Sequence, residues 1–232
     1  MIASATLIVL RDRGQRAEVL LVRRHPDLNF MGGLWAFPGG RVEPADVGIA
    51  LGDVETTSRV AACRETFEEC ALRFAPRDLL LWSHWITPAG AARRYDTRFY
   101  VVEMHNKVEI VLDQTELVDF DWLTPQAAVV AAQASTHRVS PPTHFVLEDL
   151  RLTLERHGNL TELLAAEQRR VVPPITPRLR DVDGRREVVM PWESGYLDLP
   201  GDGQPLIEHM PEHIRRLAAL GGPRLEPVIA IR

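Results

Sequence analysis

The chain of 232 residues is 45% hydrophobic and 25% charged, which is ordinary for a globular protein of one large domain or of one domain with an extension. Its formal net charge of −5 argues against a broad nucleic-acid surface, and no apolar run approaches the ~20 residues of a membrane span. Cys63 and Cys70 lie too far apart on one predicted helix for a disulfide, so we expect a cytoplasmic protein.

The first elements predict a β-hairpin. Residues 5–10 and 18–22 are short apolar runs, and the charged segment between them contains Gly14. Residues 23–35 are expected to form a loop, because they hold a proline, an asparagine and a glycine pair.

Residues 39–72 are the most informative stretch. The sequence Phe-Pro-Gly-Gly-Arg at 37–41 predicts a glycine turn leaving a strand, and the end of the stretch predicts a helix. Glu65, Glu68 and Glu69 stand at i, i+3 and i+4, so we expect their carboxylates to share one helix face and to repel one another. A hard divalent cation such as Mg²⁺ takes oxygen ligands of this kind. The alternative is a solvated helix face, and the preceding glycine turn favours the metal site.

This stretch resembles the Nudix box, the signature of hydrolases that cleave a diphosphate linked to another moiety. The matching residues are the glycine, the two charged pairs and the last aliphatic position of the signature: Gly40, Arg64, Glu65, Glu68, Glu69 and Leu72. Thr66 replaces an aliphatic residue, Ala71 replaces the second glycine, and an insertion follows Asp46, which stands where the first glutamate is expected. The resemblance implies that the three glutamates bind the metal and take part in catalysis. It also implies that Arg64 orients a glutamate through a charge pair, and it makes Asp46 a weaker candidate.

The insertion gives weaker structural signals. Pro44 and two glycines predict a broken, loose segment over 46–58, with Thr57 or Ser58 as the cap of the following helix. The apolar positions that fit a core-facing stripe of this helix are Val60, Ala61, Phe67 and Leu72. Ala71 is unfavourable at the end of the helix, where glycine is usual.

Residues 20–41 resemble the coenzyme A signature that precedes the Nudix box in coenzyme A diphosphatases. The matches of most weight are Arg24 and Gly33, whereas Gly39 and Gly40 belong to the shared glycine turn. The resemblance implies that Arg24 pairs with a substrate phosphate and that the glycine turn contributes to substrate binding. The alternative for Arg24 is an ordinary surface arginine.

Residues 78–85 and 97–103 predict two strands joined by a basic turn. The turn and the insertion are similar to the Nudix subgroup of peroxisomal coenzyme A and acyl-coenzyme A diphosphatases. Three arginines thereby become candidates for contacts with the 3′-phosphate or the diphosphate of the ligand: Arg93, Arg94 and Arg98. The alternative is that Arg94 or Arg98 pairs with Asp96 and holds the loop.

A further acidic residue precedes the strand predicted at 117–122. Many Nudix enzymes carry a glutamate at this place as an extra metal ligand or as the base for water. The resemblance therefore gives Glu116 a catalytic role and leaves Asp113 as the reserve candidate. Thr124 is expected to cap a helix that begins at Pro125.

The C-terminal part predicts helices and then an irregular tail. The expected elements are two helices, an extended segment and a hairpin: 141–157, 160–168, 171–177 and 179–190. Asn159 caps the second helix, and the Asp-Gly pair at 183–184 forms the hairpin turn. After Gly195 the glycines and prolines predict a tail that packs across the domain.

The Nudix resemblance implies an α/β/α sandwich, with a mixed β-sheet between the box helix and the helix that begins at Pro125. We expect the Nudix domain over 1–136 and a helical C-terminal extension over 137–232, packed on the same domain. The sequence leaves open whether this extension makes a homodimer contact.

The resemblance also implies a metal-dependent diphosphatase that uses Mg²⁺ or Mn²⁺ and acts on a small molecule, with no nucleic acid and no membrane as partner. The partial signature favours coenzyme A or acyl-coenzyme A, split into 3′,5′-ADP and (acyl)phosphopantetheine. ADP-ribose, NADH and a damaged nucleoside triphosphate are alternative substrates. A Nudix module that senses a nucleotide without cleaving it is an alternative of another class, and the presence of all three glutamates counts against it.

Overall fold

The computed structural model describes residues 1–14, 16–106, 108–183, 185–206 and 210–220. Within them a sheet of eight strands runs in the order β3-β2-β1-β6-β5-β8, with β4 on β1 and β7 on β2. The strands are β1 Ile2–Asp12, β2 Ala17–Arg24, β3 Trp35–Ala36, β4 Gly39–Arg41, β5 Leu80–Ile86, β6 Tyr95–Glu103, β7 Leu117–Leu123 and β8 Pro174–Ile175. Because β1 is parallel to β6 and antiparallel to β2, the sheet is mixed, as predicted.

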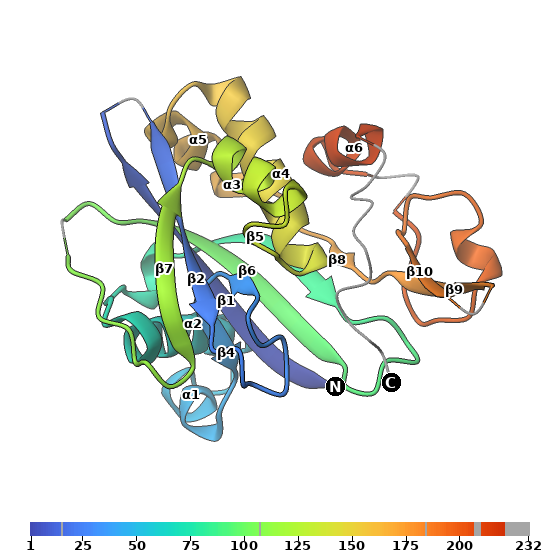
Figure 1. Ribbon diagram of the computed structural model, residues 1–232, viewed down its shortest axis with the longest axis horizontal. Helices are drawn as coiled ribbons and strands as arrows, with labels where there is room; N and C mark the ends of the chain where they lie inside the picture. Colours follow the sequence, from blue (N-terminus) through green and yellow to red (C-terminus); the bar gives the residue numbers. More distant parts are fainter. Residues whose placement is uncertain (15, 107, 184, 207–209, 221–232) are drawn as a thin grey trace.

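Helices cover both faces of the sheet (Figure 1). They are α1 Pro44–Ile49, α2 Val54–Cys70, α3 Pro125–Gln133, α4 Pro141–His157, α5 Leu160–Ala166 and α6 Glu212–Ala219. Side chains alternate along a strand, so β1 contributes to two cores. Leu7 and Val9 pack in the core beneath α2, whereas Ile8 and Leu10 pack in the core beneath α3 and α4. The predicted α/β/α sandwich is confirmed.

The N-terminal hairpin is confirmed, and its strands are longer than predicted. Arg11 pairs with Glu18 across the ladder, and their side chains form an ion pair of 2.6 Å. A charged cross-strand pair stabilises a hairpin beyond its apolar residues. The apolar runs alone therefore underestimate the strands.

The predicted break in the insertion is wrong. Pro44 is the first residue of helix α1, a position that tolerates proline because no helical N–H bond is lost there. The predicted cap of α2 is wrong as well, because the carboxylate of Asp53 accepts a hydrogen bond from the Thr56 N–H at 2.7 Å. The hydroxyls of Thr57 and Ser58 instead donate to backbone carbonyls one turn earlier.

Two further features of α2 concern its core face and its end. Val60, Ala61 and Leu72 are buried as expected, but Phe67 is 38% exposed and lies under the guanidinium of Arg73. Ala71 takes the left-handed conformation at the end of the helix, with φ 58°. Alanine thus occupies the place that glycine usually fills.

The predicted first residues of the helices after β7 are confirmed. Thr124 caps α3 through the Ala127 N–H at 3.2 Å, and α4 has the predicted bounds. The next helix is shorter than predicted, because α5 ends at Ala166 and a 3-10 turn, Glu167–Arg169, follows it.

The C-terminal hairpin consists of β9 Arg178–Val182 and β10 Arg185–Val189, and the glycine of its predicted turn lies outside the described residues. The chain after Gly195 was predicted to be irregular, yet it contains helix α6. The Arg178 guanidinium holds the segment before α6 in place, because it donates hydrogen bonds to four backbone carbonyls: Tyr196, Leu197, Leu199 and Gly203. Among the described residues, no helix is long and apolar enough to cross a membrane.

Candidate active site

The glycine turn lies directly against helix α2. The N–H of Gly39 donates a hydrogen bond to the Glu69 carboxylate at 2.8 Å. A Cβ on Gly40 would lie 2.4 Å from the carboxyl carbon of Glu65, and one on Gly39 would lie 2.4 Å from the carbonyl oxygen of Ala5. Both glycines therefore allow a close approach, Gly40 to the side chain of Glu65 on the helix and Gly39 to the backbone of β1.

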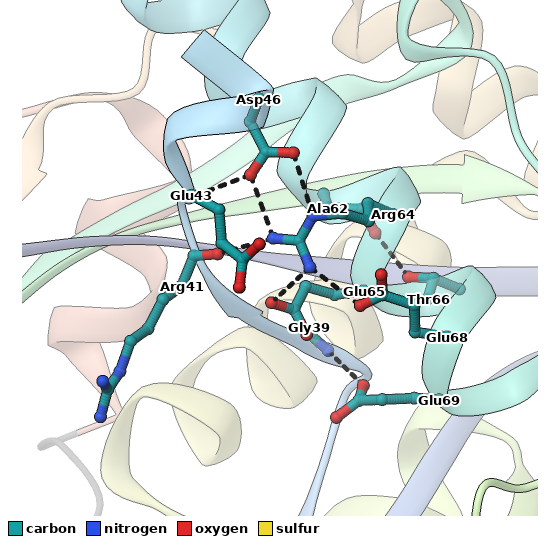
Figure 2. A network of polar contacts seen from close by, with 10 residues as sticks. All are labelled: Gly39, Arg41, Glu43, Asp46, Ala62, Arg64, Glu65, Thr66, Glu68 and Glu69. Carbon is teal, nitrogen blue, oxygen red and sulfur yellow. Dashed lines mark hydrogen bonds and ion pairs between the residues drawn. The ribbon is translucent and has the colours of Figure 1, made fainter. Parts of the chain in front are cut away.

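Arg64 is the centre of the polar network at this helix (Figure 2). Its guanidinium donates to both carboxylate oxygens of Asp46 at 3.0 Å, and Nη1 donates to Glu65 at 3.1 Å and to Glu68 at 2.9 Å. Its Nη2, which is one of the two nitrogens bound to Asp46, also donates to the carbonyl oxygen of Arg41 at 2.9 Å. Such a paired, charge-assisted arrangement fixes the guanidinium.

The three glutamates of the box stand at i, i+3 and i+4 of helix α2, and their environments differ. The Glu68 side chain is 55% exposed, whereas Glu69 is 5% exposed and turned toward Gly39. The cation among the carboxylates is the guanidinium of Arg64, which lies between Glu65 and Glu68.

The pKa of Glu69 is raised to about 8, mainly by burial and also by the charges of Glu65 and Glu116, while the Gly39 N–H and Arg24 oppose this shift. Burial also raises the pKa of Glu65. Carboxylates that crowd together in this way are better tolerated beside a cation, and oxygen donors suit a hard divalent ion. The donor chemistry therefore fits such an ion, and Gly40 leaves the space that the Glu65 carboxylate occupies. Among the described residues, however, no group of three or more acidic, histidine or cysteine side chains lies close enough together to hold a metal ion.

Arg24 and Glu116 join this site from neighbouring strands. Arg24 ends β2 and pairs with Leu117 of β7, and the His25 N–H donates to the Glu116 carbonyl at 2.7 Å. The charges of Arg24 and Glu116 both act on Glu69. The buried Nε–H of Arg24 has no hydrogen-bond partner in the described part of the chain. The sheet thus brings together residues that are far apart in the sequence.

Asp113 is used differently. Its carboxylate accepts hydrogen bonds from the N–H groups of Glu116 and Leu117 at 2.8 and 3.0 Å, and from the hydroxyl of Thr115. Although burial opposes it, these bonds lower the pKa of Asp113. Asp113 therefore shapes the turn that presents Glu116.

Two of the three arginines of the basic turn are already paired with carboxylates of the protein. Arg94 forms an ion pair with Asp202 at 2.8 Å, and its Nε donates to the carbonyl of Thr87. Arg98 pairs with Asp96 at 3.3 Å, as the alternative interpretation proposed, and also with Glu55 at 3.7 Å. Arg93 is exposed to solvent.

Two partners in these networks had little or no signal in the sequence. Asp202 lies more than a hundred positions from Arg94, and no motif connects them. Asp46 was only a weak candidate, yet its side chain is 1% exposed and holds Arg64. An acidic residue at the first glutamate position was the one available hint.

The comparison with known proteins agrees with this geometry. The family model described as NUDIX domain matches residues 1–142, which is more than half of the chain. A Caenorhabditis elegans protein that carries the name nudix hydrolase 7 is 27% identical over 240 residues, covering 88% of this chain and 77% of that protein.

Two further similarities are more limited. The acyl-coenzyme A diphosphatase NUDT19 of Xenopus laevis is 30% identical over 73 residues, which cover 30% of this chain and 19% of that protein. The crystal structure of a NUDIX hydrolase from Alicyclobacillus acidocaldarius has a TM-score of 0.58 and 25% identity, covering 65% of this chain and 90% of that one.

Proposed function

The chain belongs to the Nudix hydrolase family, whose members hydrolyse diphosphate linkages and generally use divalent metals, and on this basis we propose that its substrate is coenzyme A or acyl-coenzyme A. The products are 3′,5′-ADP and (acyl)phosphopantetheine. Residues 1–136 form the catalytic domain in this proposal, and 137–232 form an extension packed on it.

The observation that carries the substrate proposal is the position of Arg24. It matches the arginine of the coenzyme A signature, and its charge acts on Glu69 from the adjoining strand. A guanidinium beside the carboxylates suits a phosphate that lies between them. The short similarity to the frog acyl-coenzyme A diphosphatase also supports this substrate.

Each residue of the site has a distinct role in the proposed reaction. Glu65, Glu68 and Glu69 would hold Mg²⁺ or Mn²⁺. When bound, the ion supplies charge for the phosphate oxygens and lowers the pKa of a water. Arg64 holds two of the glutamates in place through its hydrogen bonds, and Glu116 is the proposed acceptor of the proton of the attacking water.

The remaining contacts bind the substrate. Arg24 holds one phosphate, and the Gly39–Gly40 turn lets the diphosphate approach the backbone closely. Arg93 is exposed and available for the 3′-phosphate. Arg94 reaches the ligand only by leaving Asp202.

Other substrates and another class of function define the alternatives. ADP-ribose, NADH or a damaged nucleoside triphosphate would use the same carboxylates and a different pocket for the rest of the ligand. A sensor that binds without cleaving does not need three glutamates, and all three are present.

The test is a substrate panel with Mg²⁺ and with Mn²⁺, with products identified by mass spectrometry. The panel holds coenzyme A, short and long acyl-coenzyme A, ADP-ribose, NADH and nucleoside triphosphates. We expect 3′,5′-ADP from the coenzyme A species and at least about a hundredfold loss of kcat in Glu69→Gln. Glu162→Gln, an exposed change on α5, is the matched control.

The outcomes separate the parts of the proposal. Cleavage of another diphosphate alone would keep the chemistry and reject coenzyme A as the substrate. Wild-type turnover in Glu69→Gln would reject the metal site. Tight binding without cleavage of any compound would favour the sensor.

A further inference from the structure

A second polar site lies in the C-terminal part of the chain, on the opposite side of the sheet from α2 (Figure 1). Helix α6 packs beside α4, and a cavity of about 340 Å³ opens between them. Its lining residues come from the end of α4, from the turn after α5 and from the start of α6: Arg156, Glu167, Arg170, Val171, Pro211, Glu212, His213 and Arg216. This volume is at the lower end of the range for pockets that bind small molecules.

Arg170 is the buried wall of this cavity. Its side chain is 1% exposed, its guanidinium lies 4.0 Å over the ring of Trp82, and it pairs with Asp149 and Glu167. Its Nε–H is buried and has no hydrogen-bond partner among the described residues. A buried donor without a partner is costly, so a bound acceptor here would be favourable.

Arg216 is the second cation of the cavity. Its Nε is buried without a partner, and no ion pair joins its guanidinium to a carboxylate in the part of the chain that the structure describes. The two acidic side chains of the lining are already engaged, Glu167 with Arg170 and Glu212 with Arg156, each at 3.0 Å. The charge of Arg216 acts on the buried Asp149, and its Nε–H remains as a donor for a ligand.

The start of α6 adds backbone donors on the same side. Pro211 stands at the cap position and provides no side-chain hydrogen bond, so among the described residues the first N–H groups of the helix have no side-chain cap. His213 of this first turn is 7% exposed, and burial, with the charges of Arg170 and Arg216, lowers its pKa to about 3. The lowered pKa follows mainly from burial, so His213 is a neutral part of the cavity wall.

We propose that the cavity between α4 and α6 binds a phosphate group, held by Arg216, by the Nε–H of Arg170 and by the first N–H groups of α6. Guanidinium groups and helix N-termini are the donors that proteins use for this anion. The cavity has room beyond a phosphate, so its ligand is either inorganic phosphate or a small phosphomonoester. The site is separate from the glutamates of α2 and does not depend on the proposed substrate.

The experiment is isothermal titration of the full chain with inorganic phosphate and with AMP, at constant ionic strength. Arg216→Gln is expected to weaken phosphate binding at least about tenfold, because one charge-assisted contact is lost. Arg169→Gln is the matched control, since Arg169 is exposed, adjoins Arg170 and does not line the cavity. Glu212→Gln should tighten binding, because it removes a negative charge from the rim and releases Arg156.

The Glu212 side chain is 62% exposed, so its variant is expected to fold even if Arg216→Gln does not. Equal phosphate affinity in wild type and Arg216→Gln would overturn the proposal, and so would weaker binding in Glu212→Gln. The proposal would also be overturned if Arg24→Gln abolished phosphate binding and Arg216→Gln did not, because phosphate would then bind beside α2. Tighter binding of AMP than of phosphate, lost in Arg216→Gln, would identify a phosphomonoester as the ligand, and equal binding would identify inorganic phosphate.

Discussion

The guanidinium of Arg64 donates to both carboxylate oxygens of Asp46, at 3.0 Å each. Asp46 belongs to helix α1 and its side chain is 1% exposed, so α1 supplies the buried partner of Arg64. Arg64 also donates to Glu65 and Glu68. A single arginine thereby connects α1 to the proposed metal ligands.

Asp46→Asn should damage both stability and activity. It leaves a guanidinium that is only 21% exposed without its main charge partner, which costs about 3 kcal/mol of unfolding free energy. Because Arg64 positions two glutamates, kcat should fall roughly 10–100-fold, as for other residues that orient metal ligands. Urea unfolding and steady-state kinetics measure the two effects. Glu155→Gln, which removes an ion pair with Arg151 on α4, is the control, and unchanged kcat in Asp46→Asn would contradict the role of Asp46.

The two glycines of the turn should respond differently to alanine. In Gly40→Ala the new Cβ would lie 2.4 Å from the Glu65 carboxyl carbon, the end of a flexible side chain, so the fold should persist while Glu65 is displaced. We expect a large loss of kcat with little change in Tm. In Gly39→Ala the clash is with the backbone of Ala5 at a φ of 152°, so Tm should fall as well. Similar Tm values for both variants would contradict this distinction.

The regular elements could be predicted because their signals are local. Apolar runs identified the hairpin strands, and Thr124 followed by Pro125 identified the start of α3. The insertion was harder, since Pro44 either breaks a chain or begins a helix and only the capping contacts decide. Helix α6 is short, and its burial depends on packing of Ile214 and Leu217 against α4, which no local pattern reveals.

The site shows the same limit. The box glutamates could be found because helical spacing is fixed, whereas the closeness of Arg24 to Glu116 follows from the pairing of β2 with β7, which the sequence does not specify. The contact between Arg94 and Asp202 joins two segments that only the packing of the C-terminal extension brings together. Contacts between distant segments therefore needed the structure.

Ala71→Gly should stabilise the protein without affecting activity. Ala71 has φ 58°, a conformation that costs a residue with a Cβ about 1–2 kcal/mol and costs glycine almost nothing. The greater freedom of glycine in the unfolded chain offsets about half of this, which leaves a gain of about 0.5–1 kcal/mol. Urea unfolding measures the gain, and kcat should not change. A less stable Ala71→Gly variant would show that the methyl group of Ala71 contributes more through packing than its conformation costs.

His213 should make the protein sensitive to mild acid. Its pKa is lowered from an ordinary 6.5 to about 3, first by burial and then by Arg170 and Arg216. Below pH 6.5 the unfolded chain takes up a proton at this residue that the folded chain does not, so stability is lost as the pH falls from about 6.5 toward about 3. The slope is at most about 1.4 kcal/mol per pH unit. His213→Gln should flatten this part of the profile, measured by urea unfolding in phosphate-free buffer, whereas the exposed His105→Gln should leave it unchanged. Carboxylates titrate in all three proteins, so the difference between the profiles isolates His213, and parallel profiles for wild type and His213→Gln would contradict the buried neutral histidine.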